Sequence, residues 1–237
     1  MIHKNYSSDI SKRKILLLST PIFFANLAIP FVGIVDTGLM GNLLEAKFLV
    51  ATSIASSIMT MIIWSFAFLR MGTVGIVAQL YGKSDYREIS KTLLRNFLIA
   101  VLISLLIILL KPIIISSAKT FFQTSNETSD LIETYISVRV LSAPAELIIY
   151  ILIGFYLGIQ KTTISSLLLI ILSTLNIILS SFFVLSLDLD VFGVVLGTLI
   201  ASYFTVFLFS IYTYRFIKNK FQITPTFQKI IVPSKLM

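Results

Sequence analysis

Six long apolar stretches divide the chain, and each is long enough to cross a lipid bilayer as a helix. A helix needs about 20 predominantly apolar residues to span the hydrocarbon core. The stretches cover roughly residues 15–40, 48–80, 93–115, 135–158, 164–187 and 191–214. They lack the alternation of barrel strands, and inside a bilayer only helices or closed barrels satisfy the backbone. The sequence therefore predicts an all-α integral membrane protein with six transmembrane helices.

The composition agrees with this class and excludes several functions. Of the 237 residues, 57% are hydrophobic and 13% are charged. The chain has no cysteine and a single histidine, His3, so it offers no thiolate or histidine metal site and no Ser-His pair. We therefore expect no enzyme, no cofactor and no metal centre.

The net charge of +8 reflects membrane topology rather than nucleic-acid binding, because the basic residues lie between apolar stretches. Those assigned to one side are Lys4, Lys12, Arg13, Lys14, Lys83, Arg87, Lys91, Arg95, Lys161, Arg215, Lys218, Lys220, Lys229 and Lys235. Loops rich in Lys and Arg stay in the cytoplasm. Both termini should therefore be cytoplasmic, with a basic leader at 1–14, a six-helix lobe at 15–214 and a basic tail at 215–237.

The first apolar stretch carries an acid, Asp36, beside a stripe of small and polar residues. Asn26, Pro30, Gly33 and Thr37 are spaced 4, 3 and 4 apart, which places them on one helix face. Pro30 should kink the helix just above the acid. Intramembrane acids are usually functional, so Asp36 is a candidate site for H⁺ or Na⁺ whose occupation bends the helix. The alternative is a solvated acid that merely ends the helix.

Two further stretches carry intramembrane cations. Arg139 and Glu146 lie two turns apart in the fourth stretch, about 10.5 Å along the axis, and both side chains are long enough to meet. We interpret them as a structural charge pair, because buried charges are usually paired. Arg70 in the second stretch is expected to reach lipid head groups rather than bind a substrate.

The last two stretches carry a polar stripe and a small-residue stripe. Ser173, Asn176 and Ser180 share one face of the fifth, which either lines a cavity or hydrogen-bonds to a neighbouring helix. Small residues recur every fourth position in the sixth, at Gly193, Gly197 and Ala201. That spacing predicts close packing of two helix backbones.

Taken together, the chain resembles the MATE multidrug and toxin extrusion antiporters, and within them the DinF-like subfamily. The matching stretches are PIFFANLAIPFVGIVDTGLMG (21–41), FAFLRMGTVGIVAQLYGKSD (66–85), YISVRVLSAPAELIIYILIGFYLGIQ (135–160), LNIILSSFFV (175–184) and GVVLGTLIASY (193–203). The resemblance implies the N-terminal lobe of a fold of twelve helices in two lobes. It implies export of cationic or amphiphilic drugs across a bacterial inner membrane, driven by inward H⁺ or Na⁺.

The resemblance also implies roles for single residues. Asp36 matches the first-helix acid whose protonation or cation binding bends the helix at Pro30, and Asn176 matches an asparagine of the same cluster. The family usually has an aspartate where this chain has Ser180, which cannot titrate.

Three functions follow from this resemblance. The first is an antiporter lobe completed by a second six-helix lobe, from another chain or a homodimer. The others are a non-transporting remnant or accessory subunit of a split transporter, and an exporter of lipid-linked polymers.

Overall fold

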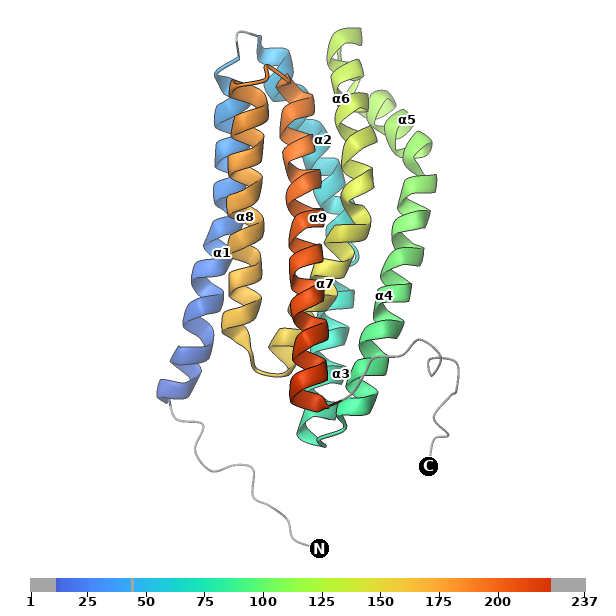
Figure 1. Ribbon diagram of the computed structural model, residues 1–237. Helices are drawn as coiled ribbons and strands as arrows, with labels where there is room; N and C mark the ends of the chain where they lie inside the picture. The colour runs from blue at the N-terminus through green and yellow to red at the C-terminus, as the bar shows by residue number, and fades with distance from the viewer. Residues whose placement is uncertain (1–11, 44, 223–237) are drawn as a thin grey trace, which may run out of the picture.

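Nine α-helices form one bundle in the computed structural model, which describes residues 12–43 and 45–222 (Figure 1). They are α1 (Lys12–Gly41), α2 (Ala46–Trp64), α3 (Phe68–Gly82), α4 (Tyr86–Leu109), α5 (Lys111–Phe122), α6 (Asn126–Arg139), α7 (Ala143–Gly158), α8 (Thr162–Leu185) and α9 (Asp190–Phe216). A 3₁₀ turn at Val140–Ser142 joins α6 to α7, and a π turn at Ile217–Phe221 follows α9. Most of the predicted leader and tail lies outside the described residues.

Six helical spans are long and apolar enough to cross a membrane, as the sequence predicted. Two of them are each built from two helices, α2 with α3 and α6 with α7. The third predicted stretch ends early, because α4 stops at Leu109 and α5 begins a separate helix with a proline in its first turn. The fourth begins early, because α6 starts at Asn126, where Ser125 accepts a hydrogen bond from the Thr128 amide.

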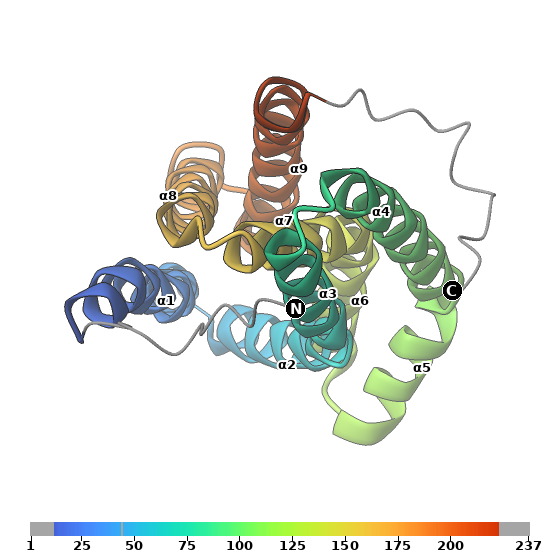
Figure 2. The same ribbon diagram turned by 90° about the horizontal axis from the view of Figure 1, so that it is seen from below.

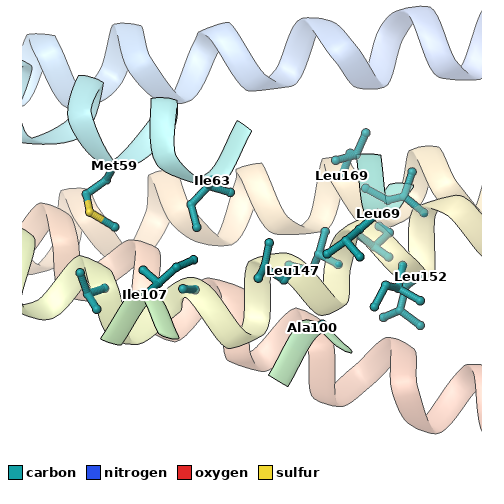
Figure 3. Packing of buried hydrophobic residues seen from close by; sticks show 14 of the residues in the cluster. Met59, Ile63, Leu69, Ala100, Ile107, Leu147, Leu152 and Leu169 are labelled. Carbon is teal, nitrogen blue, oxygen red and sulfur yellow. The ribbon is translucent and has the colours of Figure 1, made fainter. Parts of the chain in front are cut away.

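Helix α7 lies at the centre of the bundle and α1 at its edge (Figure 2). α7 packs against α3, α4, α8 and α9, whereas α1 packs mainly against α8. The side chains of α7 fill the core, with Leu147, Leu152 and Tyr156 fully buried. Figure 3 shows Leu147 and Leu152 among apolar side chains of the neighbouring helices. The Tyr156 hydroxyl is hydrogen-bonded to Thr213 of α9 at 2.6 Å.

Two glycines of α7 bring α3 unusually close. A Cβ added at Gly154 would lie 2.8 Å from the carbonyl oxygen of Arg70, and one added at Gly158 would lie 2.8 Å from the Val77 side chain. The two backbones approach only because these positions carry no side chain. This contact holds the second half of the second span against the core.

Candidate functional site

Asp36 lies on α1 with a buried carboxylate oxygen that no polar group satisfies. Its Oδ1 atom has no hydrogen-bond partner among the described residues, although the side chain as a whole is half-buried. The charged group that acts on it across the helices is Arg139 at the end of α6. A carboxylate without hydrogen bonds in an apolar setting is costly, so this position favours uptake of a proton or a small cation.

Arg139 is itself part of a dense polar cluster at the junction of α6 and α7. Its Nη2 atom donates to Glu146 Oε2 at 3.0 Å, and its Nη1 atom donates to Glu146 Oε1 and to Ser142 Oγ. The Ser142 hydroxyl also lies 2.7 Å from Glu146 Oε1. The 3₁₀ turn at Val140–Ser142 places these groups on one side of the chain. The structure therefore contains the ion pair that the sequence pattern indicated, with side-chain exposures of only 12% and 15%.

Asp36 and this ion pair form one electrostatic group. Arg139 is paired with Glu146, and its charge acts on Asp36 only at longer range, without an ion pair between them. When both acids are ionised, the group carries one net negative charge. One proton or one monovalent cation would neutralise it.

The polar residues of α8 form a second, separate cluster with α9. Asn176 donates through Nδ2 to Thr198 Oγ1 at 2.8 Å, and the Ser180 hydroxyl lies 3.3 Å from the carbonyl oxygen of Val194. Asn176 and Ser180 are both buried. Two residues of the stripe, Asn176 and Ser180, are thus hydrogen-bonded to the neighbouring helix α9.

Ser180 sits where the two backbones are closest. A Cβ added at Gly197 would lie 2.5 Å from Ser180 Oγ, so the small residue at 197 makes room for the hydroxyl. Thr198 follows Gly197 directly, and no pattern in the sequence marked it as a partner of Asn176. Tertiary packing of α8 on α9 alone brings them together.

The structure does not join these two clusters through Asp36. Among the described residues, no recorded hydrogen bond links Asp36 to Asn176 or Ser180. The sequence grouped these three residues as one cation-coupling cluster. Since α1 packs mainly against α8, which carries Asn176 and Ser180, this grouping stays a prediction.

The small and polar stripe of α1 is exposed, and its first member, Asn26, lines a cavity shared with α3, α7 and α8. Asn26, Pro30, Gly33 and Thr37 are all exposed, and α1 runs as one helix through Pro30. Helix α2 presents a similar face, where Ser57, Thr60 and Trp64 line a surface hollow of about 670 Å³. Polar side chains in membrane-length helices face protein or water rather than lipid. We therefore expect protein or water, rather than lipid, to contact these two faces.

No group of three or more His, Cys, Asp or Glu side chains capable of holding a metal ion occurs within residues 12–43 and 45–222. The polar clusters described above are built instead from one ion pair, one acid and neutral side chains.

Six membrane-length spans enclosing buried polar clusters define a multi-pass membrane protein. The MatE family model matches residues 21–182, and the chain belongs to this family. The chain is 32% identical over 191 residues to DNA damage-inducible protein F of Escherichia coli (strain K12), covering 81% of this chain and 42% of that protein. It is 25% identical over 219 residues to multidrug export protein MepA of Staphylococcus aureus (strain bovine RF122 / ET3-1), covering 92% and 48%.

The fold matches a solved structure described as the outward-facing conformation of a multidrug resistance MATE family transporter of the MOP superfamily. The TM-score is 0.82 at 20% identity, over 93% of this chain and 48% of that chain. The chain thus spans about half the length of the relatives it matches.

Proposed function

We propose that this chain is one lobe of a cation-coupled antiporter that exports cationic or amphiphilic compounds across a bacterial inner membrane. H⁺ or Na⁺ moving inward would drive export by binding at Asp36. The observation that carries the proposal is the buried, unsatisfied carboxylate oxygen of Asp36 on a helix that the rest of the bundle barely covers. The names of the relatives, a multidrug export protein and a multidrug resistance transporter, support the substrate class.

The coupling step follows from the charge balance. In the ionised state Asp36 is attracted to Arg139, which Glu146 already engages. A proton or cation at Asp36 removes that attraction, which we expect to change how α1 packs against α8. Because Ser180 cannot titrate, the second acid of this chain's coupling group is Glu146 rather than a residue of α8.

A second six-helix lobe would complete the pathway on the exposed polar faces of α1 and α2. Transporter binding sites lie between two repeats, so one lobe supplies half of such a site. The exposed part of the stripe from Pro30 to Thr37 and the hollow beside Ser57 and Trp64 are the surfaces we assign to that contact. The basic segments at both ends of the chain would lie in the cytoplasm.

Flux measurements test the coupling. Purified protein in liposomes should export a cationic dye when a pH or Na⁺ gradient is applied, and Asp36→Asn should abolish that export. Asp188→Asn is the matched control, because Asp188 lies in an exposed loop and should leave flux unchanged. Absent flux, or flux that ignores the gradient, would instead favour an accessory or non-transporting role.

Crosslinking tests the second lobe. The chain has no cysteine, so single cysteines report cleanly. Ser57→Cys in native membranes should crosslink to a second copy or to a partner of different mass. Leu102→Cys, which is 66% exposed on α4, should not, because that face contacts lipid. Equal labelling of both positions by lipid-soluble reagents, with no crosslink at either, would contradict a second lobe.

A further inference from the structure

A second cavity lies beside the first half of α3 and the first turns of α8. It has a volume of about 410 Å³ and is enclosed by α1, α3, α7 and α8. Six of its ten lining residues are apolar, among them Leu157 and Leu169. Leu169 also belongs to the buried cluster drawn in Figure 3. The cavity reaches the surface at Met71, which is 67% exposed.

Arg70 supplies the single charge in the cavity wall. It is half-buried on α3, and it makes no ion pair or side-chain hydrogen bond among the described residues. Its guanidinium carbon lies 5.8 Å from the ring centroid of Tyr150. The sequence suggested that this arginine reaches the lipid head groups, but it lies about 18 Å of helical rise before the end of α3 at Gly82.

The neighbouring intramembrane arginine provides the contrast. Arg139 is engaged by Glu146 and Ser142, as expected for a charge removed from water. The guanidinium of Arg70, with its five N–H donors, lies beside the ring of Tyr150 and a cavity. The lining of that cavity contains no carboxylate. An unpaired guanidinium beside a cavity is suited to hold an anion.

Neutral donors on two other helices complete the polar side of the cavity. Ser166 on α8 is 4% exposed, and its hydroxyl has no hydrogen-bond partner among the described residues. Ser165 is equally buried in the same wall, and the amide of Asn26 lines the cavity from α1. The serines stand in the first turns of α8, where the helix dipole favours negative charge.

We propose that this cavity binds an amphiphilic anion, a carboxylate or phosphate joined to a hydrocarbon chain. Arg70 holds the acidic group, Ser166 and Asn26 donate to it, and the apolar wall at Leu157 and Leu169 takes the chain. The charge is opposite to that of the cationic compounds assigned to the exported class. The ligand chemistry has two sources, an acidic membrane lipid or a free amphiphile such as a fatty acid or alkyl phosphate.

Fluorescence binding tests the assignment. The probe is 11-(dansylamino)undecanoate, added to protein in phosphatidylcholine nanodiscs, with empty discs subtracted. The wild-type protein should bind it saturably. Arg70→Gln should weaken binding by roughly tenfold or more, because a charge-assisted hydrogen bond is lost. Arg70→Lys should retain part of the affinity, since the positive charge remains.

Two variants keep the test decisive if Arg70→Gln fails to fold. Ser166→Ala removes a hydroxyl that has no partner, so it should preserve folding and weaken binding several-fold. Arg95→Gln is the matched control, because Arg95 is also half-buried but pairs with Glu88 at 3.0 Å away from the cavity. It should leave probe affinity unchanged.

Competition separates the two sources. Displacement of the probe when phosphatidylglycerol replaces phosphatidylcholine in the disc identifies a lipid, whereas displacement by dodecyl phosphate alone identifies a free amphiphile. Unchanged affinity in both Arg70→Gln and Ser166→Ala, or equal binding of the cationic dansyl-undecylamine, would overturn the proposal. The assay uses no gradient and no second lobe, so its failure leaves the transport proposal standing.

Discussion

The first span and the fourth span differ most in how much of their surface the other helices bury. Only 6% of the apolar window of α1 is buried, whereas 67% of the window of the α6–α7 span is buried. Both carry an acid that would be costly in hydrocarbon, Asp36 in one and Glu146 in the other. Glu146 is fully engaged by Arg139, while Asp36 has an unsatisfied oxygen. The difference separates a central span from a peripheral helix that packs mainly against α8.

The same difference in burial also affects how easily each helix can move. Elements with few buried contacts open and shift at low free-energy cost, and functional motions are drawn from them. α1 packs mainly against a single helix, α8, and contains two internal prolines, which remove backbone hydrogen bonds. α7 has apolar neighbours on four helices and close backbone contact to α3. The comparison therefore predicts that mutations in α7 lower stability and that mutations in α1 change function.

The largest effect on stability is expected for Glu146→Gln. The change leaves Arg139 as an uncompensated charge in a largely buried setting, which costs about 3–5 kcal/mol. A large drop in melting temperature in detergent would measure it. The double variant Arg139→Gln with Glu146→Gln should recover much of the loss, because no lone charge remains. A single variant as stable as the wild-type protein would mean that the pair is not structural.

A smaller loss is expected for Gly154→Ala. The added methyl group would lie 2.8 Å from both the Arg70 carbonyl oxygen and the Thr73 Cβ atom, and overpacking of this kind costs about 1–3 kcal/mol. Gly72→Ala on α3 is the matched control, since nothing lies within 4 Å of its added Cβ atom. Thermal unfolding of the two variants side by side checks the claim. Equal stability would show that α3 and α7 separate easily.

Asp36→Asn should change stability by less than about 1 kcal/mol, and it should not lower it. The carboxylate oxygen has no hydrogen bond to lose, and a neutral amide is cheaper to bury than an ionised acid. Unfolding of this variant, measured beside Glu146→Gln, compares the two acids directly. A loss as large as that of Glu146→Gln would place α1 among the structural elements.

The smallest effect on stability is expected for Lys119→Gln, which changes a solvent-exposed ion pair. Lys119 donates to Glu133 at 2.5 Å, and this hydrogen bond raises the pKa of the lysine above its usual range. Its contribution is therefore present throughout the neutral range and is lost only as pH rises through the raised value. The pair is exposed to solvent and screened by salt, so melting temperature should not change measurably. A clear shift that disappears at high salt would contradict this ranking.

The number and position of the spans followed from the sequence, but their internal breaks did not. Proline could have indicated two of these breaks. Pro112 stands at the start of α5, and Pro144 follows the 3₁₀ turn at Val140–Ser142. A proline has no amide hydrogen to donate to the preceding turn. The break between α2 and α3 at residues 65–67 contains neither glycine nor proline, and packing of α3 on α7 accompanies it.

The candidate site was predicted residue by residue but not in its grouping. Helical spacing indicated that Arg139 and Glu146 could meet, because both belong to one continuous segment. No spacing rule connects Asp36 to Arg139 or Asn176 to Thr198, which come from different helices. The cavity at Arg70 was missed for the same reason, since its donors lie on α1, α3 and α8.

The sequence by itself determined that this protein crosses a membrane six times and where its costly polar residues lie, because hydrophobicity and helical periodicity are local properties of the chain. Only the tertiary structure decided which of those residues are satisfied. Asn176 meets Thr198 from a neighbouring helix, and Asp36 keeps a carboxylate oxygen without a partner. The physical reason is that a residue's position in its span sets the cost of removing its polar atoms from water. Whether that cost is offset depends on hydrogen-bonding and charged groups that other helices bring to it.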